Sequence, residues 1–258
     1  GKKIISAQDD YGYYTYAQNI ANGINNSQFE TAFAIGIISK WGGGKTSFFN
    51  MIKDGLNDGL IEIDFNPWRS ANPKAIIKDF FETVRHSLAP HSSQLEHQLL
   101  QYGEKIIDLN DSIFSKSAKF LFAGFVPANA LSKLFDQINN TLKLLDRKVV
   151  IFIDDVDRLD KDEVFEVIRL IRNTANFYNT FFVVAYDRAY LLHSLKCLEV
   201  HQYETLLEKI FQLEITLPYF DKAVLVNRLM TNLRSILPKE RLEQISTIIF
   251  TNNILKRT

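Results

Sequence analysis

The chain has 258 residues, 46% of them hydrophobic, and its 30 Lys and Arg residues balance its 30 Asp and Glu residues. This length and hydrophobic content suit one α/β core with a smaller appendage and exclude a disordered chain. Overall neutrality gives no electrostatic indication of nucleic acid or an anionic membrane as a partner.

Cysteine usage and the start of the chain bear on the cellular setting. The single cysteine, Cys197, excludes an internal disulfide and a cysteine-rich zinc site, and it fits a reducing compartment. No charged-then-apolar leader is visible, so we expect a cytoplasmic protein. The sequence starts at Gly1 rather than Met, which leaves open that it is a piece of a longer protein.

The first 31 residues combine a tyrosine-rich segment, 11–16, with apolar residues at helical spacing. We predict a short helix there, ahead of a first strand at 32–38. The tyrosines either stack on an adenine base or, as we favour, pack on the core.

A glycine-rich loop follows the first strand and leads into a helix predicted at 44–56. The segment reads Ser39, Lys40, Trp41, Gly42, Gly43, Gly44, Lys45, Thr46 and Ser47. It predicts a phosphate-binding loop, because glycines let backbone N–H groups turn toward a polyphosphate and the helix N-terminus faces the same anion. Lys45 supplies a charge to the β- and γ-phosphates, and the Thr46 hydroxyl is a candidate Mg²⁺ ligand. The usual pattern has glycine at position 39, so we expect a distorted loop at most.

A second strand is predicted at 61–65, where apolar and acidic residues alternate before Pro67. Residues 70–146 are predicted to be mostly helical, with one helix near 94–109. The apolar segment 120–126 is far shorter than the ~20 residues that a membrane-spanning helix needs. We therefore expect no transmembrane segment and favour a buried or partner-facing helix over a hairpin that dips into a membrane.

A continuous apolar run at 149–153 predicts a central strand, and it ends in Asp154 and Asp155. An isolated pair of this kind is most often a helix cap or a turn. Together with Lys45 and Thr46, the pair predicts an active site. Asp154 would hold Mg²⁺, and Asp155 would orient or deprotonate an attacking water.

Two polar side chains near these strands have alternative interpretations. Arg158 either reaches a phosphate or a neighbouring subunit's nucleotide, or it forms an ion pair with Asp157 or Asp160. Asp187 follows a strand predicted at 181–185, and it is either a sensor of the γ-phosphate or a cap of the next helix.

The next candidates are basic or amide side chains on predicted helices. A helix at 161–175 places Arg169 and Arg172 away from its buried stripe. Lys209 and Gln212 either act across a subunit edge or, as we favour, belong to a solvated helix face.

The remaining elements complete the fold class. A fifth strand is predicted at 213–217, and helices at 221–257 would form a small lid. Strands that alternate with helices predict an α/β fold with a parallel, doubly wound sheet, whose ligand lies at the carboxyl ends of the strands.

Taken together, these segments resemble the KAP family of P-loop NTPases. The resemblance rests on Ile37–Asn50, Phe65–Arg69, Val150–Arg158, Phe182–Arg188 and Tyr203–Pro218. The tryptophan inside the loop and the Asp-Asp-x-Asp-Arg sequence make it more specific than a generic phosphate-binding loop.

The resemblance implies a P-loop NTPase fold of the additional-strand type with parallel sheet order 5-1-4-3-2, together with ATP, Mg²⁺ and switch-like use of hydrolysis. The implied domains are a core at 1–69 and 147–219, a helical insertion at 70–146, and a C-terminal lid at 220–258. Some relatives act in phage exclusion, and others are membrane-associated scaffolds with a transmembrane hairpin where this chain has the insertion. Relatives often carry a lid arginine where this chain has Asn253, which leaves Arg257 as the candidate.

We therefore assign roles to particular residues. The catalytic candidates are Lys45, Asp155, Asp187 and Arg158; the nucleotide-binding candidates are Ser39, Trp41, Gly42, Gly43, Gly44, Lys45, Thr46 and Ser47; the metal candidates are Thr46 and Asp154.

The leading hypothesis is an ATPase whose nucleotide cycle drives a conformational or assembly switch, in bacterial antiphage defence or signalling. The alternative is a nucleotide-binding scaffold with little turnover, motivated by Ser39 and the missing lid arginine. A phosphotransferase would need an acceptor pocket with its own base, and no second motif indicates one. As partners we expect ATP and either further copies of the chain or another protein, contacted through the helical insertion.

Overall fold

The computed structural model describes residues 12–110, 129–197 and 203–218, and single residues from Met230 to Ile245. Tyr11, the segment 120–126, Asn253, Arg257 and most of the predicted lid lie outside the described residues. The chain divides into two compact units, residues 1–216 and 217–258, and the sheet with its helices makes up the first.

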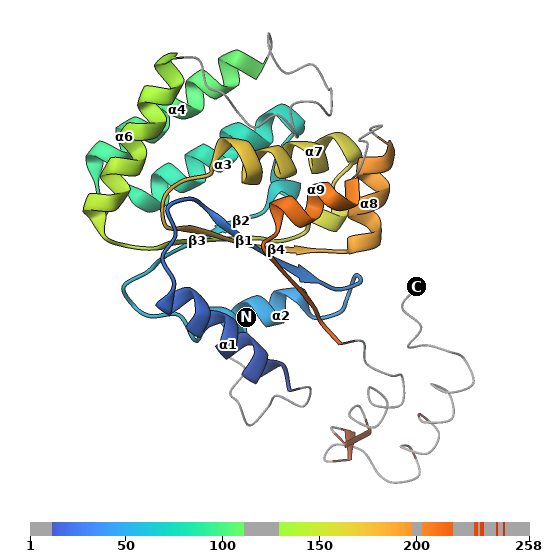
Figure 1. Ribbon diagram of the computed structural model, residues 1–258. Coiled ribbons are helices and arrows are strands. Elements are labelled where there is room, and N and C mark those ends of the chain that lie inside the picture. Colours follow the sequence, from blue (N-terminus) through green and yellow to red (C-terminus); the bar gives the residue numbers. More distant parts are fainter. Residues whose placement is uncertain are drawn as a thin grey trace. The chain divides into compact units, whose positions relative to one another are not determined.

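Five parallel strands form one sheet in the order β2-β3-β4-β1-β5 (Figure 1). Their bounds are β1 Phe33–Ile38, β2 Ile61–Phe65, β3 Val149–Ile153, β4 Thr180–Tyr186 and β5 Leu213–Thr216. The predicted α/β class and the order 5-1-4-3-2 are confirmed. In this order β4 lies between β1 and β3, so the strand that leads to Lys45 and Thr46 and the strand that leads to Asp154 and Asp155 are separated by one strand.

The burial of each strand follows from its place in the sheet. β3 and β4 are buried along their whole length and are apolar apart from Thr180, because helices cover both faces of a central strand. β2 is an edge strand and alternates buried apolar residues with exposed acidic ones. The sequence pattern of each strand therefore reports how central it is.

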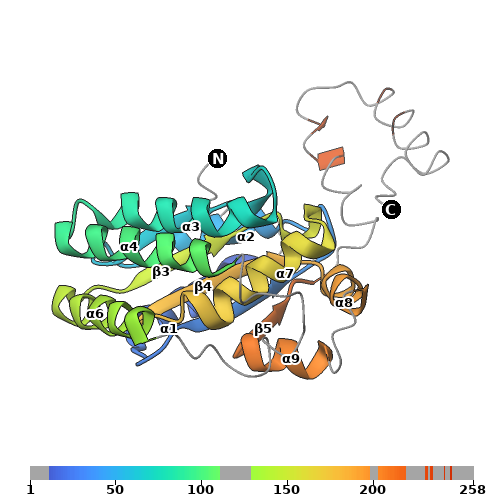
Figure 2. The ribbon, with the colours of Figure 1, turned by 90° about the horizontal axis from the view of Figure 1, so that it is seen from above.

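Helices cover the sheet on both faces (Figures 1 and 2). On one face lie α1 Tyr13–Asn26 and α2 Lys45–Lys53, which is three residues shorter at its end than predicted. On the other lie α3 Pro73–Leu88, α4 Ser93–Asn110, α6 Asn129–Leu145, α7 Lys161–Arg169, α8 Arg188–Cys197 and α9 Tyr203–Ile210. Across the residues with described positions, no helix combines the length and apolar character needed to cross a membrane.

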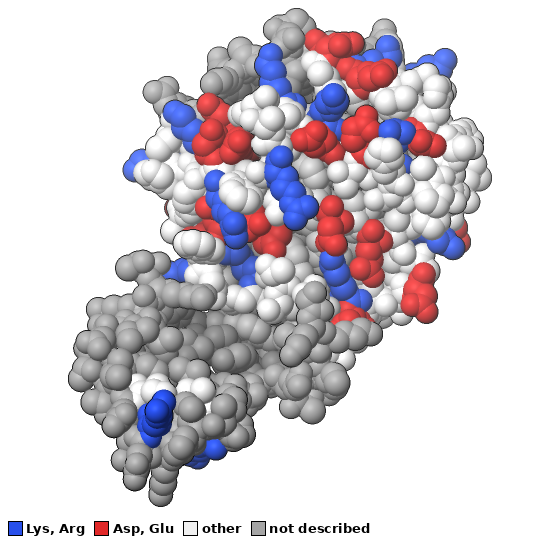
Figure 3. All heavy atoms as spheres, turned by 180° about the vertical axis from the view of Figure 1, so that it is seen from behind, with Lys and Arg blue, Asp and Glu red and all other residues white. Residues whose placement is uncertain are grey.

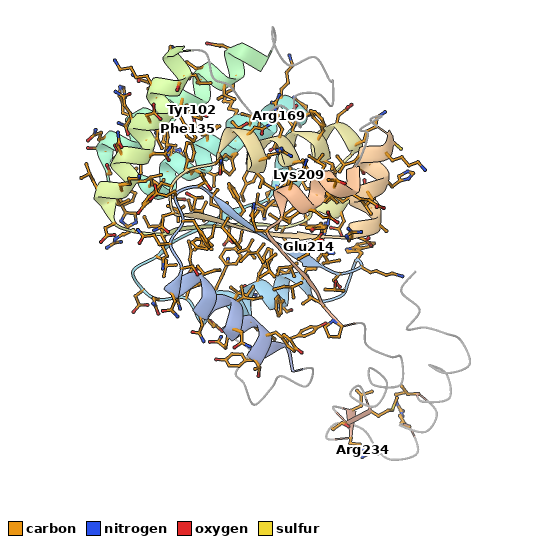
Figure 4. The ribbon with its side chains drawn as sticks, viewed as in Figure 1. Tyr102, Phe135, Arg169, Lys209, Glu214 and Arg234 are labelled. Atoms are coloured by element: carbon orange, nitrogen blue, oxygen red, sulfur yellow. The ribbon has the colours of Figure 1, made fainter. Side chains whose placement is uncertain are left out.

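A series of aromatic rings joins the sheet to the helices between β2 and β3. Phe65 of β2 contacts Phe80 of α3 with ring centroids 5.3 Å apart, and the adjacent Phe81 contacts Tyr102 of α4 at 5.5 Å. Tyr102 lies next to Phe135 of α6 at 6.3 Å (Figure 4). These three helices therefore share the core of the sheet, and their packing fixes their position beside it.

One helix differs from its prediction. The segment predicted as a helix at 161–175 is α-helical only as far as Arg169 and continues as a π-helical turn, Leu170–Thr174. The prediction that Arg169 lies away from the buried stripe is wrong, because its side chain is only 3% exposed and pairs with Glu166 at 2.5 Å. A charged side chain that has its own partner on the preceding turn can be buried, and burial raises the pKa of Glu166.

Charged side chains are mixed on the surface shown in Figure 3. Lys and Arg alternate with Asp and Glu over the described part of that face, and no broad patch of one sign forms there. This distribution agrees with the neutral composition of the whole chain.

The structure predicts that Gly36 of β1 tolerates no side chain. A Cβ at this position would lie 2.5 Å from the hydroxyl oxygen of Tyr186, which is buried and donates a hydrogen bond to Glu214 at 2.6 Å. We expect Gly36→Ala to lower the free energy of unfolding by about 1–3 kcal/mol in urea titrations, because the ring cannot move aside. Gly59→Ala is the control, since its Cβ would meet nothing within 4 Å, and should stay within ~0.5 kcal/mol of the parent. Equal losses for the two variants would contradict this account.

Candidate functional site

The candidate site lies at the carboxyl ends of β1 and β3. In the parallel register, Ile38 of β1 is level with Tyr186 of β4, and Ile153 of β3 is level with Val184. The loop after β1 and the turn after β3 therefore leave the sheet at nearly the same height. They approach each other over the end of β4.

The loop between β1 and α2 has the backbone that its glycines make possible. Gly42 and Gly44 have φ values of 77° and 87°, in the left-handed region that favours glycine. A Cβ on Gly43 would lie 1.8 Å from the Oγ of Ser39, so the serine at the first position occupies space that only a glycine at position 43 leaves open. The N–H of Ser39 donates to the carbonyl of Tyr186 at 3.1 Å, which joins the loop to β4. Trp41 at the loop tip is 73% exposed.

Lys45 points inward and is already paired. Its Nζ lies 2.7 Å from Oδ2 of Asp157, and both side chains are 7% exposed. The same ammonium donates to the carbonyl oxygens of Ser39 at 3.1 Å and Lys40 at 3.4 Å. Asp157 was not among the predicted site residues. It is the third acid in the sequence after β3, and the short 3₁₀ turn Val156–Arg158 brings it to the lysine.

Thr46 and Asp154 meet directly. The Thr46 hydroxyl donates to Oδ2 of Asp154 at 2.6 Å, and the other oxygen of Asp154 accepts the N–H of Asp155 at 2.8 Å. Hydroxyl and carboxylate oxygens are the donor set that Mg²⁺ takes when phosphates and water supply its other ligands. A cavity of about 620 Å³ adjoins this pair. Within the described ranges no group of three or more His, Cys, Asp or Glu side chains is placed to hold a metal.

Asp155 is held from two sides. Its Oδ2 accepts a hydrogen bond from Nδ2 of Asn66 at 2.8 Å, and its Oδ1 lies 2.8 Å from Nε of Arg158. The guanidinium of Arg158 also lies 5.0 Å from the ring centroid of Trp68. Asp155 has a φ of 60°, which is uncommon for a residue other than glycine. This left-handed conformation ends the extended backbone of β3 and leads directly into the 3₁₀ turn.

These contacts correct one expectation and add one residue. Arg158 does form a local ion pair, but with Asp155 and not with Asp157 or Asp160. Asn66 was not predicted as a site residue. Its signal in the sequence was its position at the end of β2, directly before Pro67, where a polar side chain leaves the sheet beside the end of β3.

Other predicted residues lie around this centre or are engaged elsewhere. Oδ1 of Asp187 accepts the N–H groups of Ala189 and Tyr190 at 2.9 and 3.3 Å, so this side chain caps α8. Ser47 is exposed on the first turn of α2. Gln212 is exposed, as favoured, but it follows the end of α9 and its Oε1 accepts the N–H of Ala34 at 2.7 Å.

A family model and a curated relative indicate the same family for this chain. A model of the KAP family P-loop domain matches residues 13–256. The Phage T7 exclusion protein of Escherichia coli (strain K12) is 27% identical over an alignment of 247 residues that covers 82% of this chain and 33% of that protein. This chain therefore spans about a third of the length of that relative.

Two solved structures align with most of this chain. The Aeropyrum pernix ORC1 protein in complex with DNA aligns with a TM-score of 0.48 and 10% identity, over 97% of this chain and 56% of that chain. Cdc6p from Pyrobaculum aerophilum aligns with a TM-score of 0.46 and 13% identity, over 91% of this chain and 51% of that chain.

The buried pair of Lys45 and Asp157 predicts a strong coupling in the nucleotide-free protein. Removal of one charge leaves the other buried without a partner, and we expect Asp157→Asn to lower the free energy of unfolding by about 3–5 kcal/mol. The double variant Lys45→Met, Asp157→Leu removes both charges and should recover most of that loss. Urea titrations of Asp157→Asn, of the single variants Lys45→Met and Asp157→Leu, and of the double variant provide the measurement. If the double variant loses as much free energy of unfolding as its two single variants together, the attraction between Lys45 and Asp157 does not offset the cost of burying their charges.

Proposed function

The chain belongs to the KAP family of P-loop NTPases, and from that we propose that it binds ATP with Mg²⁺ and hydrolyses it to drive a conformational or assembly switch. The observation that carries this proposal is the contact of Thr46 with Asp154 at 2.6 Å beside the ammonium of Lys45. A cation, a hydroxyl and a carboxylate that converge at the carboxyl edge of a parallel sheet suit a triphosphate and its metal.

The proposal assigns roles to the backbone and side chains of the loop. The N–H groups of residues 42–47 and the ammonium of Lys45 bind the phosphates. Thr46 and Asp154 hold Mg²⁺, which neutralises charge on the phosphate oxygens. Trp41 is exposed at the tip of the loop, and it would have to move from this position to cover the bound nucleotide.

Loading the site requires two exchanges of partner. Lys45 has to leave Asp157 to reach the phosphates, because its ammonium is the charge that both carboxylate and phosphate compete for. Asp155 acts on the attacking water through an oxygen that Asn66 or Arg158 now occupies. The proton of that water passes to Asp155 or is held by it while the bond to the γ-phosphorus forms and ADP leaves. Release of Arg158 from Asp155 would free its guanidinium for the phosphates.

Further parts of the proposal rest on sequence alone. Asp187 remains our candidate sensor, in addition to its role as a cap. Helices α3, α4 and α6 within residues 70–146 are the proposed contact with other copies of the chain or with a partner protein. The family and the phage-exclusion relative favour a role in antiphage defence inside the cytoplasm.

A second candidate function is a nucleotide-binding scaffold with little turnover. The observation that favours it is the double hold on Asp155, since a carboxylate engaged by Asn66 and Arg158 is not available to a water. A scaffold would bind ATP tightly and assemble with negligible phosphate release, even with its partners present. An ATPase would release phosphate steadily under the same conditions.

The test of the enzymatic proposal is phosphate release with Mg²⁺ and ATP. We expect Lys45→Ala and Asp155→Asn each to lower the rate by about a hundredfold or more, because each removes charge that stabilises the transition state or positions the water. Matched controls are Lys161→Ala on α7 and Asp58→Asn in the turn before β2, both exposed, which should leave the rate unchanged. Turnover that survives both site substitutions would reject the proposal.

The pairing of Lys45 with Asp157 also predicts how ATP affinity responds to substitution. Asp157→Asn removes the competitor for the ammonium and a negative charge near the triphosphate, so we expect ATP to bind about tenfold more tightly. Titration of a fluorescent ATP analogue measures this, with Asp58→Asn again as the control. Weaker binding in Asp157→Asn would mean that Asp157 assists the nucleotide and does not compete with it.

A further inference from the structure

A second polar pocket lies at the opposite end of β1 from the phosphate loop. It has a volume of about 230 Å³ and is bounded by the start of β1, the π-helical turn and the end of α9. Its polar lining residues are Thr31, Arg172, Asn176, Lys209 and Gln212. The rise along a strand of ~3.3 Å per residue separates it from the loop that begins at Ser39 by roughly 15–20 Å. It is therefore not part of the site described above.

The amide side chains of this pocket are oriented as donors. Oδ1 of Asn176 accepts the N–H of Ala32 at 2.9 Å, and Oε1 of Gln212 accepts the N–H of Ala34 at 2.7 Å. A backbone N–H can bond only to the oxygen of an amide, so these contacts fix which end of each amide is which. The NH₂ groups of both side chains are left for another acceptor.

Arg172 supplies a charge that the described residues do not compensate. Its Nη1 is buried and has no hydrogen-bond partner among them. Burial lowers the pKa of Arg172, and no carboxylate in the described part of the chain opposes that effect. Lys209, on the exposed side of α9, adds a second positive charge (Figure 4). Within the described residues, no Asp or Glu lines the pocket.

We propose that this pocket binds a phosphate group. Arg172 as a whole is half-buried, and a buried guanidinium nitrogen without a partner is unfavourable; an anion that accepts its N–H group removes that cost. The pocket offers a guanidinium, an ammonium, two amide NH₂ groups and a hydroxyl, which suit the several acceptor oxygens of a tetrahedral oxyanion better than a single carboxylate. Arg172 also lies in a π-helical turn, a feature frequent at functional sites.

The phosphate has two possible sources. One is free inorganic phosphate. The other is the terminal phosphate of a nucleotide held by a second copy of the chain, which presents its phosphate loop to this pocket. Both use the same donors, so the proposal concerns the chemistry, and separate measurements distinguish the sources.

The test uses the Lys45→Ala protein, in which the phosphate loop is weakened, and inorganic phosphate as the probe. Thermal unfolding is followed as phosphate increases at constant ionic strength. We expect phosphate to raise the midpoint, and Arg172→Gln in the same background to weaken the apparent affinity by at least about tenfold. Lys209→Gln should weaken it less because its ammonium is exposed. Lys196→Gln, which removes an exposed charge outside the pocket, should not change it.

Two further readouts separate binding from a structural role. Without phosphate, Arg172→Gln should unfold at the same or a higher temperature than its parent, because it removes a half-buried charge that the described residues do not compensate. Acetate at the same concentration should not raise the midpoint. The proposal is overturned if phosphate raises the midpoint equally with and without Arg172, if it raises neither, or if acetate acts as well as phosphate.

Mass photometry of otherwise wild-type protein assigns the source. Self-association that depends on a non-hydrolysable ATP analogue, and that Arg172→Gln but not Lys196→Gln abolishes, assigns the phosphate to a nucleotide on a second copy. Phosphate binding with self-association unaffected by Arg172→Gln assigns it to the free ion. The phosphate titration does not require hydrolysis, so it stands apart from the test of the ATPase proposal.

Discussion

The placement of β4 between β1 and β3 is the constraint on which the candidate site depends. Adjacent strands lie ~4.8 Å apart, so the ends of β1 and β3 are about 10 Å from each other. The loop after β1 and the turn after β3 both lean over the end of β4, and the N–H of Ser39 donates to Tyr186 at that end. The spacing lets Thr46 touch Asp154, whereas a pairing out of register would separate the hydroxyl from the carboxylate.

The charges of this site compensate one another within the chain. Lys45 is neutralised by Asp157, and Asp155 is neutralised by Arg158 with the help of Asn66. A charge at the edge of the core is unfavourable unless it is paired, so these contacts explain how a cluster of charged side chains is accommodated there. The proposed nucleotide would compete for the same groups. In that proposal, binding exchanges one set of ion pairs for another, which is the physical basis of a switch.

The pocket at the start of β1 differs from the candidate site in how its charges are paired. There the charge of Arg172 is left uncompensated by the described residues, and the neighbouring amides present donors. One strand thus connects a site whose charges are paired internally with a pocket that lacks an anion partner. If both proposals hold, β1 is the rigid element that joins two phosphate sites at its opposite ends.

Much of this arrangement could be predicted from the sequence because it is encoded locally. Hydrophobic runs, and the polar or proline residues that end them, indicated the strands. The glycines before Lys45 indicated the phosphate-binding loop. The position of Asp154 and Asp155 directly after β3 indicated where carboxylates meet that loop. Strand order came from the family resemblance, since no local pattern states which strands are neighbours.

The sequence by itself determined which residue types stand at the ends of the strands, because a strand followed by a polar residue presents that residue at the sheet edge. Only the tertiary structure decided how those residues pair. Asp157 reaches Lys45, Arg158 turns to Asp155, and Arg169 is buried beside Glu166, because each pairing depends on a turn or on a helix geometry that residue spacing does not specify. Charge pairing is a matter of a few ångströms in space, whereas a sequence pattern fixes only the order along the chain.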